Sequence, residues 1–217
     1  MSQEVKIMAG IIVATLLIVV GGAIFMGGSQ TPSTSSQKID TTLLIKKTSH
    51  QTAPSAKNQL VEFGDYQCPA CGAYHPIVKK IIQTYGSKLT VVFRNYPLTQ
   101  HKNARIAAEA AEAAGIQGKF WEMHDMIYEN QDKWSESDKP LEIFSEYAKS
   151  LGIDVSVFQK DVDEKKYENI ITGDQSDGNA AGVNSTPTFF LNGEKVDTNS
   201  IRDYPSFKTL IDSQLKK

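Results

Sequence analysis

Cysteine is scarce in this sequence, which has two cysteines among 217 residues. So low a content excludes a disulfide scaffold of the kind that stabilises small secreted domains. The two are Cys68 and Cys71, with two residues between them. A bridge that closes so short a loop removes little entropy from the unfolded chain, so the pair is not expected to act as a structural staple.

Runs of basic residues are also missing. The formal net charge is -2 and the isoelectric point is near 6.1. Proteins that bind nucleic acid usually present a basic patch or stripe to the phosphates. Because this chain has no such run, nucleic acid is not expected among its partners.

Charged residues are absent from residues 7–28, an apolar run of about 22 positions. At about 1.5 Å per residue, a helix of this length crosses a hydrocarbon core of about 30 Å. We therefore expect residues 1–28 to form a signal anchor, with a transmembrane helix that contacts the lipid bilayer. Lys6 and the N-terminal amine, partly offset by Glu4, favour an inward N-terminus with the rest of the chain outside the membrane.

A cleaved signal peptide is the alternative for this segment. The apolar run exceeds the roughly 7 to 15 residues of a signal core, and no clear cleavage motif follows, although residues 27–29 are small. No cysteine follows the run directly, which excludes a lipoprotein anchor. Residues 29–38 are rich in serine and threonine and predict a flexible linker, which leaves residues 39–217 for the folded domain.

The two cysteines stand at a turn between two predicted elements. Residues 60–63 have the composition of a strand, and residues 71–85 have the pattern of a helix. Cys68 is therefore expected at a helix N-terminus, where free backbone N–H groups and the helix dipole stabilise a thiolate and lower its pKa from about 8.5. A Cys-x-x-Cys on such a turn is typical of a reversible dithiol–disulfide switch.

The rest of the chain predicts an α/β domain that is interrupted by helices. The elements are expected in this order: strands at 39–47 and 59–64, a helix at 71–85, a strand at 88–96, a helical block at 103–182, a hairpin at 188–197 with an Asn-Gly turn, and a helix at 204–215. This is the order of a thioredoxin core that carries a helical insertion at about residues 100–182.

Four segments resemble the DsbA-like family of thioredoxin-fold disulfide oxidoreductases, over roughly residues 59–217. They are FGDYQCPAC at 63–71 followed by His75 and Pro76, VFRNYPL at 92–98, FWEMHD at 120–125, and STPTFF at 185–190. The resemblance implies a thioredoxin fold and an enzyme that exchanges thiols and disulfides.

The resemblance assigns roles to five residues. Cys68 would be the nucleophilic, partly exposed cysteine and Cys71 its buried partner. Pro187, preceded by Thr186, would form a cis peptide that turns the strand and leaves the backbone at Thr186 free to pair with an extended substrate. Glu62 would be a buried acid beneath the disulfide that relays a proton to or from Cys71.

Two of these positions also have simpler interpretations. Pro187 could begin an ordinary strand, and Glu62 could face solvent at the end of a strand. Some strongly oxidising family members carry a histidine between the cysteines, whereas Pro69 and Ala70 stand here. Thiolate stabilisation would then depend on the helix N-terminus and nearby backbone N–H groups.

The resemblance implies an extracytoplasmic enzyme that introduces disulfide bonds into exported proteins, at the cell surface or in the periplasm. Its expected partners are unfolded or reduced exported polypeptides, and a membrane quinone-linked thiol oxidase that reoxidises Cys68 and Cys71. No cofactor and no metal ion are expected. A reductase or isomerase of the same fold, with a lower potential and a membrane electron donor, is the alternative.

Two further alternatives come from other classes of protein. Cys68, Cys71 and His75 supply three possible ligands for a metal-binding tethered module, although structural zinc sites usually have four ligands and Pro76 restricts that turn. The histidines at positions 50, 101 and 124 show no spacing that indicates a site. The second alternative is a non-enzymatic scaffold with the thioredoxin fold, and the intact cysteine pair argues against it.

Overall fold

The computed structural model describes residues 38–216. The predicted transmembrane helix at 7–28 and nearly all of the predicted linker lie outside the described residues. None of the helices in the described part is both long and apolar enough to cross a bilayer.

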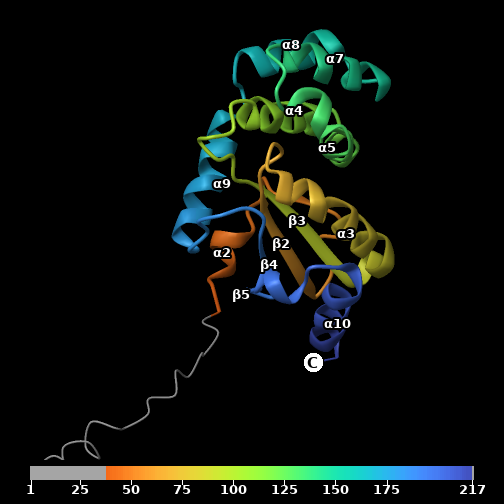
Figure 1. Ribbon diagram of the computed structural model, residues 1–217, viewed down its shortest axis with the longest axis vertical. Helices are drawn as coiled ribbons and strands as arrows, with labels where there is room; N and C mark the ends of the chain where they lie inside the picture. Colours follow the sequence, from red (N-terminus) through yellow and green to blue (C-terminus); the bar gives the residue numbers. More distant parts are fainter. Residues whose placement is uncertain (1–37, 217) are drawn as a thin grey trace, which may run out of the picture. The chain divides into compact units, whose positions relative to one another are not determined.

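A mixed β-sheet forms the centre of the domain (Figure 1). Within residues 38–216 it has five strands in the order β1-β3-β2-β4-β5. The strands are β1 (His50–Gln51), β2 (Asn58–Gly64), β3 (Leu89–Asn95), β4 (Thr188–Leu191) and β5 (Glu194–Lys195). β2 and β3 are parallel, and every other neighbouring pair is antiparallel. Asn192 and Gly193, between β4 and β5, have positive φ angles of 52° and 86°, as an Asn-Gly hairpin turn requires.

Alternation along the strands packs each face of the sheet against its own helices. On one face, Leu60 and Phe189 share a core with α3 (Pro69–Tyr85) and α10 (Tyr204–Leu215). On the other face, Val61 and Phe190 share a core with α2 (Thr41–Leu44) and the residues that follow α9 (Glu168–Ala180). Figure 1 shows α3 and α9 on opposite sides of β2 and β3. Because both faces are covered, a polar residue in the second half of β2 is buried on whichever side it lies.

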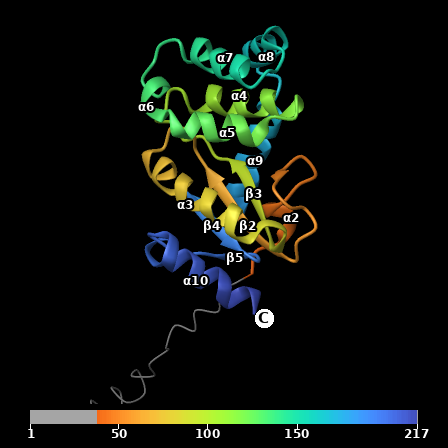
Figure 2. The ribbon, with the colours of Figure 1, turned by 90° about the vertical axis from the view of Figure 1, so that its right-hand side faces the viewer.

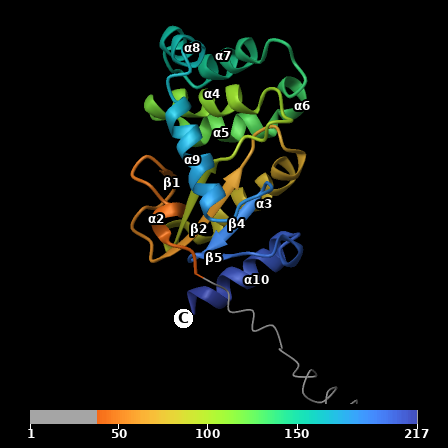
Figure 3. The ribbon, with the colours of Figure 1, turned by 90° about the vertical axis from the view of Figure 1, so that its left-hand side faces the viewer.

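The chain between β3 and β4 forms the helical insertion. It contains α4 (Ala104–Ile116), α5 (Phe120–Glu129), α6 (Gln131–Trp134), α7 (Pro140–Ser150), α8 (Val155–Asp163) and α9. Figures 2 and 3 show α4 and α5 next to the sheet, with α7 and α8 beyond them. One apolar core joins Trp134 and Phe144 of the insertion to Tyr66 and Cys71. The predicted α/β fold with a helical insertion is confirmed, and the insertion packs on the cysteine turn.

The strand expected at 39–47 is wrong. Thr41–Leu44 forms the short helix α2, which begins where the Asp40 carboxylate accepts a hydrogen bond from the Thr42 N–H at 2.9 Å. The strand at this edge of the sheet is instead β1, which lies between the strands expected at 39–47 and 59–64 and pairs with β3. Local capping and the burial of Leu44 outweigh the strand composition of this segment.

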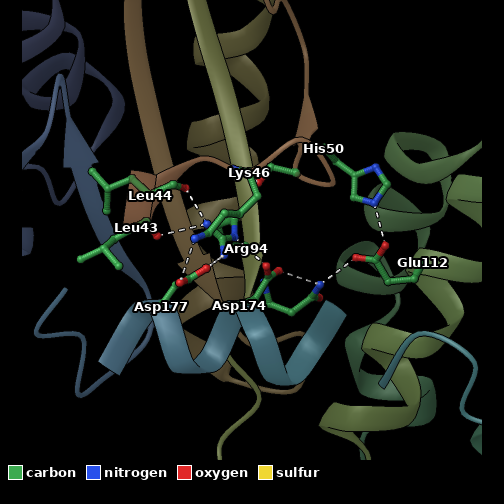
Figure 4. A network of polar contacts seen from close by, with 10 residues as sticks. Leu43, Leu44, Lys46, His50, Arg94, Glu112, Asp174 and Asp177 are labelled. Carbon is green, nitrogen blue, oxygen red and sulfur yellow. Dashed lines mark hydrogen bonds and ion pairs between the residues drawn. The ribbon is translucent and has the colours of Figure 1, made fainter. Parts of the chain in front are cut away.

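A buried arginine holds α2 and α9 against the sheet (Figure 4). The Arg94 side chain, from β3, is fully buried and donates to the backbone oxygens of Leu43 and Leu44. It also donates to the carboxylates of Asp174 at 2.7 Å and Asp177 at 2.6 Å. A guanidinium can serve all four groups because its five N–H donors point in fixed directions. Arg94 thus fastens segments that are 50 and 80 positions from it in the sequence.

The polar network continues into the insertion (Figure 4). Asn95 Nδ2 donates to Glu112 Oε1 at 2.8 Å, and His50 Nε2 lies 2.8 Å from Glu112 Oε2. Glu112 belongs to α4 and His50 to β1. The network therefore connects the sheet edge, the sheet centre and the insertion.

Candidate active site

The two cysteines lie where the chain leaves β2 and begins α3. Cys68 is the N-cap of α3, and Pro69 lies in the first turn, where the helix does not need its missing N–H. The Cys68 N–H donates to the Asp65 carbonyl oxygen at 3.1 Å and closes the turn. Cys68 is 7% exposed, whereas Cys71 is fully buried. Cys68 is thus more buried than the partly exposed cysteine that was predicted, but of the two it alone keeps exposed surface toward an incoming sulfur. Residues 65–71 are called the redox turn below.

The start of β4 meets the redox turn. The Thr186–Pro187 peptide bond is cis, and Cys68 Sγ lies 3.4 Å from the Thr186 carbonyl oxygen, to which the protonated thiol donates. These two residues are 118 positions apart in the sequence. They meet because β4 pairs with β2 in a register that sets Thr188 opposite Phe63. The fold thus gathers three of the predicted site residues at one point.

The two thiols have opposite acidities. A hydrogen bond from the Cys71 thiol lowers the pKa of Cys68 to about 5, with smaller help from the backbone N–H groups of Cys71 and Ala70, and against the effect of burial. Burial raises the pKa of Cys71 well above the ordinary thiol value, and the charge of Glu62 adds to this. At neutral pH the pair therefore carries one thiolate, on the more accessible sulfur.

In the reduced protein, Cys68 is expected to titrate with a midpoint near pH 5. Its folded pKa lies below the unfolded value of about 8.5, so the thiolate stabilises the reduced fold fully above that value, and this contribution is lost as the pH falls toward 5. Thiolate ultraviolet absorbance and the rate of alkylation against pH measure the midpoint. Cys68→Ser should lack the transition, and a wild-type midpoint near 8.5 would contradict the expectation.

Glu62 lies in β2 and is 4% exposed, so it does not face solvent. Burial, with a smaller effect of the Cys68 charge, raises the pKa of Glu62 to about 8. The same carboxylate contributes to the raised pKa of Cys71. At neutral pH, Glu62 is therefore a mostly protonated acid near the buried thiol, which is the state that a proton donor to Cys71 requires.

Glu62→Gln is expected to stabilise the fold, and more so at pH 7 than at pH 5. The folded pKa of about 8 lies above the ordinary value of 4.5, so folding is penalised increasingly as the pH rises from about 4.5 to 8. Glutamine keeps the shape and does not ionise, and removal of the penalty is worth up to about 3 kcal/mol at pH 7. Urea denaturation at both pH values measures the gain, and equal gains at the two would contradict this account.

Asp65 is a residue of the redox turn whose role sequence reasoning missed. Its side chain is 1% exposed. Its carboxylate lies within hydrogen-bond distance of the backbone N–H of Gln67 (2.7 Å), the backbone N–H of Leu98 (2.8 Å) and the ring of His101 (2.7 Å). Asp65 thus ties the chain before Cys68 to the segment that follows β3. Its position three residues before Cys68 was the one available signal, since two of its partners are 33 and 36 positions away.

Gln131 holds the redox turn from the insertion. Its Nε2 donates to the carbonyl oxygens of Tyr66 at 2.7 Å and Cys68 at 3.0 Å. A Cβ at Gly72 would lie 2.7 Å from Gln131 Oε1, so the Gln131 side chain would have to shift if position 72 were not glycine. No local pattern around position 131 indicates this contact, because it exists only once the insertion has folded onto α3.

The metal site considered for Cys68, Cys71 and His75 has no counterpart in the geometry. In the part of the chain that the structure describes, His75 groups with His124 and Asp125, and neither sulfur belongs to that group.

Comparison with known proteins identifies the family. Residues 45–213 match the family model described as thioredoxin. A protein named probable disulfide bond formation protein D, from Bacillus cereus, is 32% identical over 168 residues, which cover 73% of this chain and 74% of that protein. The chain belongs to the DsbA-like disulfide oxidoreductases of the thioredoxin family.

A solved structure gives the same fold for this DsbA-like protein. Oxidised BdbD from Bacillus subtilis superimposes with a TM-score of 0.70 at 24% identity, over 79% of this chain and 95% of that one. A second group of relatives is named as Na⁺/H⁺ antiporters. NhaA 1 of Salinispora arenicola is 37% identical over 137 residues, 63% of this chain and 20% of the antiporter. The DsbA-like chain thus spans about a fifth of the length of these relatives.

Proposed function

We propose that this protein is an extracytoplasmic thiol oxidase, tethered to a membrane, that introduces disulfide bonds into exported proteins through Cys68 and Cys71. The observation that carries the proposal is the contrast between the two thiols, with the pKa of Cys68 lowered to about 5 and that of Cys71 raised. A stabilised thiolate favours the reduced form of the pair. The disulfide form is correspondingly a stronger oxidant of other thiols.

The size of this effect favours oxidation over reduction. At pH 7, a thiol with a pKa near 5 gains about 3 kcal/mol from ionisation, whereas an ordinary thiol gains almost nothing. For a two-electron couple this equals roughly 60 mV of additional oxidising potential. The Cys68 thiolate is stabilised without a histidine between the cysteines, because the Cys71 thiol and the first backbone N–H groups of α3 donate hydrogen bonds to it.

The exchange proceeds in two steps. A substrate thiolate attacks Cys68 Sγ of the disulfide, a mixed disulfide forms, and the electron pair of the broken bond leaves on Cys71 Sγ. Cys71 then takes a proton, for which the Glu62 carboxyl is the nearby donor in this proposal. A second substrate thiolate attacks the substrate sulfur of the mixed disulfide and releases Cys68 as a thiolate. The substrate loses two electrons and the enzyme gains them.

We expect an extended polypeptide to bind beside Pro187, whose neighbour Thr186 contacts Cys68. A cavity of about 360 Å³ adjoins Pro187 and is lined by Ser185, Val196 and Thr198 among others. Pro187 has no N–H of its own, so backbone pairing with an extended chain would use the backbone groups of Thr186. These features support an unfolded or reduced polypeptide as the substrate.

The remaining parts of the proposal concern the membrane. The reduced Cys68–Cys71 pair would return its two electrons to a membrane quinone-linked thiol oxidase, and residues 7–28 would hold the domain at the lipid bilayer. The apolar, uncharged composition of residues 7–28 supports this. The similarity to a segment of proteins named as antiporters also supports work at a membrane.

Equilibration with mixtures of reduced and oxidised glutathione tests the direction of exchange. The expected potential of the Cys68–Cys71 couple lies well above the roughly -270 mV of thioredoxin. The oxidised protein is also expected to introduce disulfides into a reduced, unfolded test protein. A potential at or below that of thioredoxin would support the reductase alternative, and failure to oxidise the test protein would overturn the oxidase proposal.

A further inference from the structure

A second cluster of side chains with donor atoms lies between α3 and α5. His75 is one helical turn beyond Cys71 on α3, and His124 and Asp125 are neighbours on α5. One nitrogen or oxygen atom of each residue lies within 4.8 Å of those of the other two. We propose that these three residues form a binding site for a divalent transition-metal ion, with zinc as the best fit.

The His75 ring is a candidate donor that lies in the interior, stacked on the Tyr128 ring at a centroid distance of 5.1 Å. The residue is 6% exposed, and its Nε2 makes no hydrogen bond in the part of the chain that the structure describes, with Asp125 Oδ1 3.5 Å away. Buried polar atoms normally have a partner, and a metal ion would provide one. Burial also lowers the pKa of His75, so the ring is neutral at pH 7 and carries the lone pair that a metal ion needs.

His124 has its second nitrogen fixed by Tyr66. Tyr66 Oη lies 3.0 Å from His124 Nδ1, in a pair that is fully buried. When Nδ1 holds the proton and donates it to the phenol oxygen, Nε2 is left with a free lone pair. A metal-bound histidine commonly has such a partner on its other nitrogen, which sets the tautomer and the ring orientation. Burial lowers the pKa of His124 as well, so this ring is neutral.

One spacing between the donor atoms matches tetrahedral coordination, and the other two are within 4.8 Å. Zinc bonds of about 2.0–2.1 Å to nitrogen and oxygen set neighbouring ligand atoms about 3.4 Å apart. His75 Nε2 lies 3.5 Å from Asp125 Oδ1, which is close to this value. Two imidazoles and one carboxylate are a donor set typical of zinc with an open fourth position. Because Asp125 is about one-third exposed, an ion and a water molecule can enter from that side.

Two neighbouring groups set the strength of the site. Glu129 Oε1 lies 3.9 Å from His75 Nε2 and adds negative charge beside the donors. Lys79 Nζ lies 2.7 Å from the outer oxygen of Asp125 and 2.6 Å from Glu129. The ammonium group competes with a metal ion for these carboxylates, so the site is expected to exchange its ion rather than hold it permanently. A bound ion would join α3, the helix that begins at the redox turn, to the insertion.

Zinc binding to the full chain in its oxidised form tests the proposal, because a Cys68–Cys71 disulfide leaves no thiolate to bind the ion. Competition with a chromogenic chelator is expected to give one zinc ion per chain. Co²⁺ should give the visible absorption of a tetrahedral site without the intense sulfur-to-metal band. The thermal unfolding midpoint should rise with zinc concentration.

Three variants separate this site from general surface binding. Asp125→Asn changes a partly exposed ligand and is expected to weaken zinc binding at least tenfold. Tyr66→Phe should weaken zinc binding by about 10- to 100-fold, the usual cost of removing the hydrogen-bond partner of a metal-bound histidine. Glu122→Gln, an exposed carboxylate on the same helix, is the matched control and should change nothing. Absence of zinc binding by the oxidised wild type, or equal binding by wild type and Asp125→Asn, would overturn the proposal.

Discussion

Cys68→Ser is expected to remove the disulfide-forming activity, by roughly three orders of magnitude or more, as is usual for loss of a catalytic nucleophile. Cys71→Ser is expected to behave differently. Its remaining Cys68 thiolate can still attack a disulfide substrate, but the buried thiol that would complete the exchange is gone. Cys71→Ser should therefore accumulate mixed disulfides with substrate, which non-reducing electrophoresis and mass spectrometry detect.

The two cysteine variants control for each other, since each removes one sulfur atom from the same turn. The asymmetry of the pair predicts the difference between them, because Cys68 is 7% exposed and Cys71 is fully buried. Circular dichroism and thermal unfolding would serve to check that both variants are folded. Equal trapping by both variants would show that the two sulfurs are interchangeable and would contradict the assignment of Cys68 as the attacking residue.

Arg94→Leu is expected to lower the free energy of unfolding by about 3–5 kcal/mol, the usual cost of removing one partner from a buried ion pair. The Asp174 side chain is 7% exposed and the Asp177 side chain 18% exposed, so both carboxylates would lose their partner in a poorly solvated place. The backbone oxygens of Leu43 and Leu44 would lose their donors as well. Urea denaturation monitored by tryptophan fluorescence measures the loss.

Arg105→Gln is the matched control for this prediction. The Arg105 side chain is 43% exposed and pairs with Glu168 at the surface, where an ion pair contributes about 0–1 kcal/mol. Arg94→Lys should fall between the two, because lysine keeps the charge but cannot reach four acceptors in different directions. A loss for Arg94→Leu no larger than that for Arg105→Gln would show that the network in Figure 4 is not a main source of stability.

Several features of the fold are determined by short stretches of sequence. Residues 204–215 were predicted as a helix and form α10, which a capping box at Asp203 and Ser206 begins. The Asn192-Gly193 turn sets the β4–β5 hairpin because both residues adopt positive φ angles. The same holds for Cys68, which lies at the N-terminus of α3 because an apolar strand ends and a helical pattern begins within a few positions. In these places the interactions are between residues close in the chain.

Other features depend on contacts between residues far apart in the chain. The segment 39–47 has strand composition, yet it forms α2 because Asp40 caps a helix whose carbonyl oxygens Arg94 binds from about 50 positions away. The roles of Asp65 and Gln131 were likewise hidden, since their partners are on separate elements. His75 was considered as a metal ligand only with the two cysteines and His124 was assigned to no site, and only the packing of α3 on α5 brings their rings together.

For the redox turn, the sequence alone determined that two cysteines stand two residues apart and that Cys68 lies at a helix N-terminus. Only the tertiary structure decided that Cys71 is fully buried, that Thr186 reaches Cys68, and that Glu62 lies in an apolar interior. The physical reason is that burial is a property of the assembled sheet, helices and insertion. Burial raises the pKa of Cys71, the hydrogen bond from the Cys71 thiol lowers that of Cys68, and this separation carries the proposed direction of exchange.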